Sequence, residues 1–233
     1  MVFNLQSISR ASPDTAHWLD MKLKTSAAPF VPAVKTLSML RTAAAGCQGC
    51  ELYRSATQTV FGEGPAVTPM MLIGETPGDR EDKAGQPFIG PAGQLLGRVL
   101  EQVGLPRTEV YITNAVKHFR WTLRGDRRIH QKPTGSQIQA CRPWLEAEIE
   151  AVKPRVIVCL GAVAAQTLLG SSFRITLQRG QVLPSQWAEA LVATYHPAAI
   201  LRVPTDEERR RMLTDFTTDL HLAVQTLNAL APR

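Results

Sequence analysis

Residues 74–93, GETPGDREDKAGQPFIGPAG, combine acidic side chains with a high density of glycine and proline. They follow the short apolar run 70–73, which has the composition of a buried strand. Open α/β sheets bind ligands at the carboxyl ends of their strands, so carboxylates here are candidates for acid–base or electrostatic chemistry. These carboxylates belong to Glu75, Asp79, Glu81 and Asp82. The Gly-Lys-Ser/Thr ending of a phosphate-binding loop is absent, and the simpler alternative is an acidic connector between a strand and a helix.

Four cysteines offer thiolates to a metal. Cys47 and Cys50 form a C-x2-C pair, a spacing that suits two ligands on one metal and is too short for a useful structural disulfide. Cys141 and Cys159 lie much further along the chain. Zinc and a [4Fe–4S] cluster both accept four cysteines, but zinc sites usually take their ligands as two close pairs, so the wide second spacing favours the cluster in a structural role. The alternative for Cys159, in VIVCLG, is a small core hydrophobe.

A basic segment covers residues 117–133, KHFRWTLRGDRRIHQKP. Its six Lys or Arg against a single Asp give a local charge of +5, nearly the whole net charge of +6. Arginines interleaved with Trp and Phe suit a phosphate backbone and exposed bases, whereas the alternative is a solvated loop. His130 follows two arginines, whose charge should lower its pKa and keep the imidazole neutral and nucleophilic near neutral pH.

These groups need a scaffold, and the hydrophobic pattern predicts one. Buried strands are expected at residues 70–75, 110–116, 156–160 and 191–195, and helices at 33–45, 92–103, 136–152, 162–169 and 205–229. Strands alternating with helices predict an α/β fold with three layers, α/β/α, around a central four-stranded parallel sheet. GETPG, Asn114 and His196-Pro197 each stand at the carboxyl end of a predicted strand, so we expect them to meet at one edge.

At 233 residues the chain can hold one domain, expected at 34–233, and an extension at 1–33 that lacks periodicity and should be weakly ordered. The extension could also be a remnant of a neighbouring domain. No apolar run approaches the roughly 20 residues of a membrane span, and the first ten residues lack the apolar core of a secretory signal. We expect a monomer in a reducing cytoplasm, and the pI of about 9.4 favours a polyanionic partner.

Taken together, the motifs resemble those of the uracil-DNA glycosylase superfamily, from about residue 43 to the last predicted helix. GETPGDREDKAGQPFIGPAG is similar to the GE-x-PG…G-x-PF-x-G-x-AG signature of its iron–sulfur members. TNAVKHF and YHPAAILR are similar to its uracil-reading and His-Pro motifs, and the cysteine arrangement also matches, which supports a [4Fe–4S] cluster. The insert ending Arg-Arg-Ile-His resembles the UdgX group, which excises uracil and then stays covalently attached to the DNA.

This resemblance implies a role for each matching position. Glu75 would be the catalytic carboxylate, His130 the covalent nucleophile and His196 the contact to a uracil carbonyl. Phe88 would stack on the base, with core packing as its alternative, and Asn114 would bond the base edge. The other implied positions are Gly74, Thr76 and Asp79 for substrate, Arg127, Arg128, Lys132 and Arg202 for DNA, and Cys47, Cys50, Cys141 and Cys159 for the cluster.

Two positions depart from the UdgX pattern: Thr76 stands where that group usually has Gln, and Asp126 stands where it usually has Lys. The first bears on base contacts and on the polarity around Glu75, and the second removes a cation from the insert. Uracil-containing DNA is the expected partner, with single strands accepted. Three functions stay open: covalent trapping through His130, a turning-over iron–sulfur glycosylase in which His130 only contacts DNA, and a non-catalytic nucleic-acid-binding module.

Overall fold

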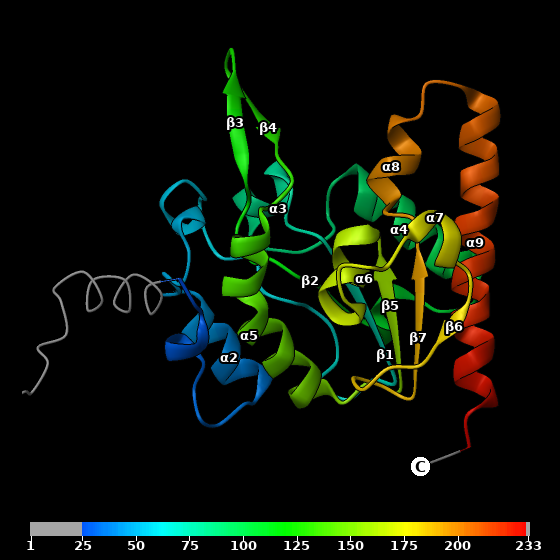
Figure 1. Ribbon diagram of the computed structural model, residues 1–233, viewed down its shortest axis with the longest axis horizontal. Helices are drawn as coiled ribbons and strands as arrows, with labels where there is room; N and C mark the ends of the chain where they lie inside the picture. Colours follow the sequence, from blue (N-terminus) through cyan, green and yellow to red (C-terminus); the bar gives the residue numbers. More distant parts are fainter. Residues whose placement is uncertain (1–24, 232–233) are drawn as a thin grey trace, which may run out of the picture.

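The computed structural model describes residues 25–231, which form a sheet enclosed between two helical layers (Figure 1). The strands are β1 (Met70–Gly74), β2 (Tyr111–Asn114), β3 (Trp121–Arg124), β4 (Arg127–His130), β5 (Val156–Leu160), β6 (Val182–Leu183) and β7 (Ala190–Thr194). The α-helices are α2 (Leu37–Ala44), α3 (Asp79–Ala84), α4 (Pro91–Gln102), α5 (Gly135–Val152), α6 (Ala162–Leu169), α7 (Ile175–Gln178), α8 (Pro197–Arg202) and α9 (Asp206–Ala229). Three single-turn 3-10 helices lie at Ala28–Phe30, Glu51–Arg54 and Arg107–Glu109.

The predicted α/β/α fold is confirmed, but the main sheet has five strands rather than four. Within residues 25–231 its order is β2-β1-β5-β7-β6, with β6 antiparallel to β7 and the other neighbours parallel. The four predicted strands are the four parallel ones. The strand β6 is not predictable from the hydrophobic pattern, because a strand of two residues is too short to show a period.

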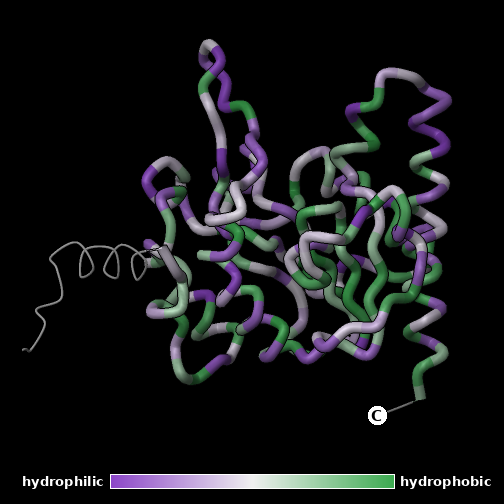
Figure 2. The backbone as a smooth tube through the Cα atoms, viewed as in Figure 1, coloured by the Kyte–Doolittle hydropathy of each residue, from purple (hydrophilic) through white to green (hydrophobic). Residues whose placement is uncertain are grey.

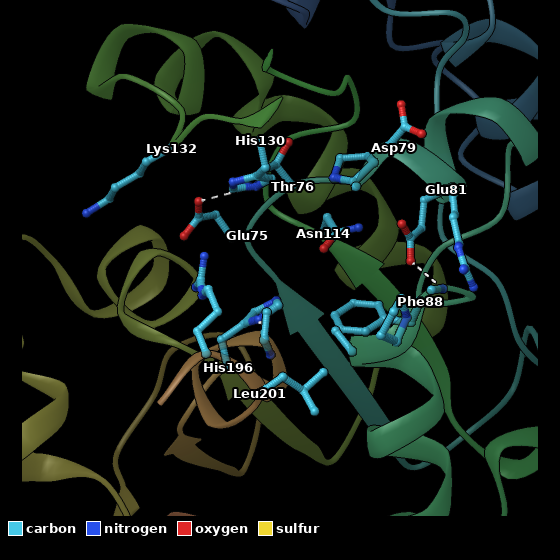
Figure 3. A pocket seen from close by; sticks show the side chains of 18 residues that line it. Glu75, Thr76, Asp79, Glu81, Phe88, Asn114, His130, Lys132, His196 and Leu201 are labelled. Carbon is cyan, nitrogen blue, oxygen red and sulfur yellow. Dashed lines mark hydrogen bonds and ion pairs between the residues drawn. The ribbon is translucent and has the colours of Figure 1, made fainter. Parts of the chain in front are cut away.

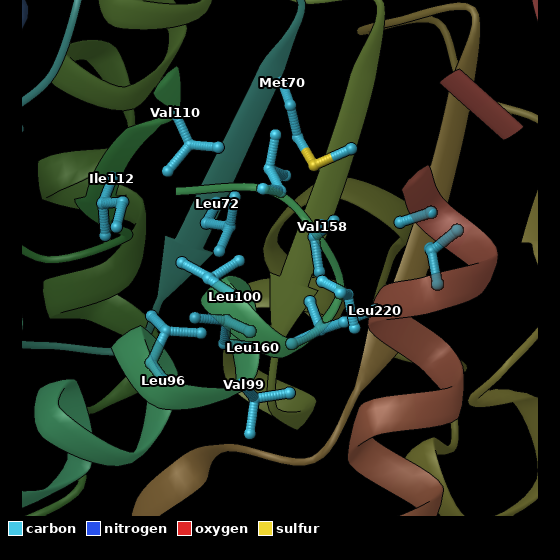
Figure 4. Packing of buried hydrophobic residues seen from close by; sticks show 14 of the residues in the cluster. Met70, Leu72, Leu96, Val99, Leu100, Val110, Ile112, Val158, Leu160 and Leu220 are labelled. Atoms are coloured by element: carbon cyan, nitrogen blue, oxygen red, sulfur yellow. The ribbon is translucent and has the colours of Figure 1, made fainter. Parts of the chain in front are cut away.

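Successive side chains of a strand point to opposite faces of the sheet, so the core is divided into two layers. Met70 and Leu72 of β1 pack with α4, α8 and α9 on one face, as the cluster in Figure 4 shows. Met71 and Ile73 point to the opposite face and pack with α5 and α6. The hydropathy view agrees: apolar residues run through the central strands, and hydrophilic residues concentrate on the outer helices and on the β3–β4 ribbon (Figure 2). Burial on both faces is what near-continuous apolar strands require.

Capping residues decide where several helices begin. Thr36, Thr134 and Thr205 each accept a hydrogen bond from a backbone N–H in the first turn of α2, α5 and α9. The predicted helix 33–45 therefore starts only at Leu37, whereas the predicted start of the last helix is confirmed. None of the helices in the described part of the chain combines the length and apolarity needed to cross a membrane.

The amino-terminal part of the described chain packs against α5. Ala27 is buried, and its N–H donates to the carbonyl of Ala140 at 2.7 Å. A side chain at Gly49 would collide with this backbone, so the turn after Cys47 can accept only glycine there. Residues 1–24, most of the predicted extension, lie outside the described residues.

The basic insert is not the loop that the sequence suggested: it folds into an antiparallel hairpin, β3–β4, that projects beyond the main sheet (Figure 1). Its register pairs Trp121 with His130 and Arg124 with Arg127. Gly125, with φ of +60°, takes the first central position of the two-residue turn, where a positive φ suits glycine. The hairpin thus fixes the position of His130 at the end of β4.

Candidate active site

A cavity of about 630 Å³ opens at the carboxyl edge of the sheet (Figure 3). Its walls come from the loop after β1, the end of β2, the segment after β4 and the start of α8. The lining includes Glu75, Phe88, Asn114, His130 and His196. The predicted meeting of the loop after β1 with Asn114 and His196 is therefore what the fold produces, and Phe88 and His130 join them. Parallel strands bring loops distant in sequence to one edge, which is why the motifs meet.

Glu75 and His130 face each other across the mouth of the cavity, with 4.0 Å between Glu75 Oε1 and His130 Nε2. Burial raises the pKa of the Glu75 carboxyl above its ordinary value, while the charges of Lys132 and Arg202 oppose that rise. Burial also lowers the pKa of the His130 imidazole, helped by Arg202 and opposed by Glu81. The direction of this shift is as predicted, but its causes are burial and Arg202 rather than the two preceding arginines.

His196 is oriented by the start of α8. The backbone N–H of Ala198 donates to His196 Nδ1 at 3.1 Å, so in the neutral ring the proton is on Nε2. Burial, followed by the charges of Arg202 and His130, lowers the pKa of His196 to about 4. At neutral pH the ring is therefore an uncharged N–H donor at the cavity wall.

Phe88 and Asn114 form the inner part of the cavity. The Phe88 ring lies 5.8 Å from the His196 ring between centroids and is inclined to it by 32°. Asn114 is 2% exposed, and its Oδ1 has no hydrogen-bond partner among the described residues. A side chain at Gly74 would collide with both Asn114 Oδ1 and the Phe88 ring, so this position of the predicted motif must be glycine. A buried acceptor left without a donor is suited to a ligand that supplies one.

Phe88 adopts a backbone conformation that needs support. Its φ of +55° is unusual for a residue other than glycine. Arg107 donates to the carbonyls of Pro87 and Phe88, at 2.5 and 3.1 Å, and Glu81 Oε1 accepts from the next two backbone N–H groups, at 3.1 and 2.8 Å. Arg107 has no role predicted from the sequence, because an arginine that binds backbone carbonyls leaves no motif. Glu81 stood out only as one of four acids.

The remaining predicted substrate positions are partly engaged by the protein itself. Thr76 lines the cavity, but its hydroxyl donates to the carbonyl of His118 at 2.9 Å. Asp79 also lines the cavity, and its carboxylate accepts from Arg128 Nε at 2.6 Å and Lys83 Nζ at 2.7 Å. Both side chains hold the loop after β1 in place.

The four predicted DNA contacts separate into two groups. Lys132 and Arg202 line the cavity, where each lowers the pKa of Glu75. Arg127 and Arg128 do not line it. Arg127 is exposed on the hairpin, whereas Arg128 is turned inward. Proximity in sequence does not predict this separation, because neighbouring residues of a strand point to opposite faces.

Arg128 anchors the hairpin to α3. Besides its bond to Asp79, its Nη1 donates to Asp82 Oδ2 at 2.7 Å and to Thr57 Oγ1 at 3.1 Å. Its guanidinium also lies over the ring of Trp121 at 5.5 Å. Asp82 is fully buried and so provides a fixed point. Arg128 is two residues before His130, so this contact holds the imidazole in the cavity.

Arg128→Gln should therefore detach the hairpin. We expect the free energy of unfolding to fall by roughly 2 kcal/mol, since charge-assisted bonds to two carboxylates are lost, and tryptic cleavage within residues 120–128 to accelerate. Denaturant unfolding and limited proteolysis measure both effects. The matched control is Arg127→Gln, at a neighbouring exposed residue that forms no ion pair within the described chain. Equal losses in the two variants would contradict the anchoring role.

Three of the four cysteines lie in one buried cluster. Cys47, Cys50 and Cys141 pack with Trp144, whose indole Nε1 donates to Cys47 Sγ at 3.1 Å. Burial raises the pKa of Cys141 to about 12, and negative charge on Cys50 and Cys47 adds to the rise, whereas Lys117 opposes it.

Cys159 does not join them. It lies on β5 and packs with Ile73 and Ala193 in the core layer under α6, as the alternative of a small core hydrophobe predicted. The described residues contain no group of three or more His, Cys, Asp or Glu side chains arranged to hold a metal ion. The predicted set of four thiolates is therefore not assembled here, because the alternation of β5 points Cys159 into the core.

Comparison with known proteins adds to this geometry. The sequence pattern of the uracil DNA glycosylase superfamily matches residues 61–221. The type-4 uracil-DNA glycosylase of Thermotoga maritima is 38% identical over 171 residues, which cover 73% of this chain and 85% of that protein. Its counterpart from Archaeoglobus fulgidus is 38% identical over 177 residues, covering 73% and 84%, and that from Sulfurisphaera tokodaii is 34% identical over 197 residues, covering 81% and 86%.

Proposed function

The chain belongs to the uracil-DNA glycosylase superfamily, and from this premise we propose that it excises uracil from DNA. The observation that carries the proposal is the single cavity that Glu75, Phe88, Asn114 and His196 share. These four groups offer a carboxylate, a flat ring, an unpartnered amide oxygen and a neutral N–H donor. That combination suits a planar base on a sugar that develops positive charge.

Base selection depends on Asn114 and Phe88. The glycosidic bond is inaccessible inside a duplex, so the nucleotide must leave the stack and enter the cavity. Uracil carries a hydrogen on N3, which Asn114 Oδ1 can accept, and the amide nitrogen can donate to O4. Cytosine has an unprotonated N3 that would oppose the same oxygen, and leaving a buried acceptor unpaired is costly. Phe88 supplies the surface on which the base stacks.

Bond cleavage separates charge. The C1′–N1 bond breaks with its electron pair going to uracil, which leaves an anionic base and a cationic sugar. His196 Nε2–H donates to the developing charge on a uracil oxygen, and Glu75 stabilises the sugar cation. His196 is in the required neutral state near neutral pH, because its pKa is about 4. The charges of Lys132 and Arg202 favour the ionised form of Glu75, against the burial that raises its pKa.

After the base has left, either water or His130 can attack C1′ of the sugar. The relatives are named as glycosylases, which favours hydrolysis by water and repeated turnover. Covalent trapping is the second candidate, and the observation that favours it is His130 Nε2, held 4.0 Å from Glu75 Oε1 at the cavity mouth. In that step the unprotonated Nε2 of the neutral ring gives its electron pair to C1′ of the sugar cation, and the resulting imidazolium loses its Nδ1 proton to solvent.

A single gel experiment tests the function. Oligonucleotides with one uracil, and matched ones with thymine, are incubated with the protein and resolved under denaturing conditions with and without alkali. Excision gives an alkali-cleavable product from uracil only; covalent trapping gives a shifted protein–DNA band. Equal binding of both oligonucleotides with neither product would contradict the proposal and leave a non-catalytic nucleic-acid-binding module.

Asn114→Asp should weaken excision of uracil on the order of a hundredfold, because a carboxylate cannot donate to O4. The same carboxylate accepts from the amino group of cytosine, so the ratio of uracil to cytosine excision should fall further. Single-turnover rates on matched oligonucleotides measure both. Excision of uracil at the parent rate would remove Asn114 from base recognition.

We also propose that Cys47, Cys50 and Cys141 hold a [4Fe–4S] cluster that ties the segment after α2 to α5. The shared burial of these three thiols in one packing cluster supports it. Its role is structural, and no step of the reaction depends on it. Cys159, the fourth predicted ligand, lies apart from the other three.

Protein purified under low oxygen should be brown, with about four iron atoms per chain if the cluster is complete. Cys47→Ala should lose the iron and most of the soluble yield, because a structural metal centre contributes folding energy. Metal analysis and the visible absorption spectrum measure this. Colourless protein with one zinc would reject the cluster. Cys159→Ala is the matched variant: loss of iron equal to that of Cys47→Ala assigns the fourth ligand to β5, and full iron retention places it elsewhere.

A further inference from the structure

Lys117 and Glu148 form an ion pair inside the molecule, with side chains 1% and 0% exposed. Removing two charges from water is costly, and such pairs are often no more stabilising than apolar side chains of the same size. A gain in folding stability therefore does not explain well why a lysine occupies this buried position. Neither residue lines the cavity.

Each hydrogen of the Lys117 ammonium has an acceptor. One bond goes to Glu148 Oε2, one to Thr113 Oγ1 at 2.7 Å, and one to the backbone carbonyl of Asn114 at 2.7 Å. The other Glu148 oxygen accepts from Tyr111 Oη at 2.9 Å, among other donors. An ammonium has three donors, and all three are used. The third one holds the main chain of Asn114.

The Asn114 side chain lacks such a restraint at its oxygen. Oδ1 is buried and has no partner in the described part of the chain. Its direction therefore follows from the main chain, whose carbonyl Lys117 holds. The next two residues are also fixed: the N–H groups of Ala115 and Val116 donate to the carbonyls of Gly74 and Glu75, at 2.9 and 3.0 Å.

We propose that Lys117 is a positioning residue that aims the Asn114 amide at the base, with Glu148 as its counter-charge. The inference rests on the proposed function and extends it to a residue outside the cavity. The contribution of Lys117 to base recognition passes through Asn114, so it should disappear when the Asn114 amide is absent.

The test variant is Lys117→Met combined with Glu148→Gln. The two substitutions together remove both buried charges. The glutamine side chain keeps an oxygen that can accept the hydrogen bond from Tyr111. We expect the single-turnover rate on a uracil oligonucleotide to fall by roughly a hundredfold, as misplacement of about 1 Å can do, and the ratio of uracil to cytosine excision to fall with it. In a protein that also carries Asn114→Ala, the same two substitutions should lower the rate less than twofold. If the two substitutions lower the rate by the same factor with and without Asn114→Ala, the proposal is overturned.

Tyr111→Phe is the control, because it removes a bond to the same carboxylate without touching Asn114. It should lower thermal stability and leave the rate and base selectivity unchanged; a loss of selectivity equal to that of the Lys117 variant would assign the effect to general destabilisation and overturn the proposal. Should the double variant fail to fold, Glu148→Gln alone enters the same cycle, with a smaller loss expected only when Asn114 is present.

A readout independent of catalysis separates this inference from the proposed function. The side-chain amide resonances of Asn114 should shift in the Lys117→Met, Glu148→Gln variant and stay in place in Tyr111→Phe. Unshifted resonances in both would overturn the positioning role even if uracil is excised. A parent protein that excises no uracil would overturn the proposed function, while the resonances still decide the role of Lys117.

Discussion

Glu75→Gln is expected to lower uracil release by about 10³-fold, the effect of removing one preorganised electrostatic group from a transition state. Glutamine keeps the size of the side chain and its place in the cavity, and it removes the negative charge that faces the sugar cation. Both endings of the reaction need this charge, so excision and any covalent adduct should decline together. The measurement is the single-turnover rate on a uracil oligonucleotide.

The control for Glu75→Gln is Asp126→Asn, which removes the same charge from the exposed hairpin turn and should leave the rate unchanged. A pH profile adds a second check. Burial raises the pKa of Glu75, so the active carboxylate forms as pH rises through that raised value, and the parent rate should climb on the acidic side. The Glu75→Gln variant lacks this group, and its residual rate should not show the same rise. Parent-like release by Glu75→Gln would remove the carboxylate from the mechanism.

His130→Ser tests the proposed covalent step and carries the second large expected effect: any covalent product should disappear, and uracil should be released repeatedly. Serine is too short to reach C1′ from the end of β4, and its hydroxyl is a weak nucleophile without a base. Glu75 and His196 remain, so the bond still breaks and water enters the space that the imidazole left. The measurement combines the shifted band on a denaturing gel with uracil released per protein molecule.

Ile129→Ser is the matched control, since the residue is next to His130 on the same strand and its side chain points to the other face. It should keep the parent's product. A shifted band that persists in His130→Ser would exclude this histidine as the nucleophile. A parent that never gives the band is a turning-over glycosylase, in which His130→Ser should change the rate only modestly.

The amino-acid sequence by itself determined the scaffold and the main site. Its apolar runs predicted the four parallel strands, because strands buried on both faces are continuous in hydrophobicity. Glu75, Asn114 and His196 stood at the ends of such runs, and the geometry of a parallel sheet brings those ends to one edge. Local composition and the succession of strands and helices along the chain were sufficient for both conclusions.

Only the tertiary structure decided which polar groups are free to act. Arg127 and Arg128 are equivalent in sequence, yet Arg128 is bound to a buried aspartate and Arg127 is exposed. Cys159 matches the expected ligand pattern, but the alternation of β5 turns it into the core. Lys117 appeared as one cation of a basic segment and is instead enclosed behind Asn114. In each case the outcome depends on partners distant in sequence, because burial and hydrogen bonding are set by the packing of whole elements rather than by neighbouring residues.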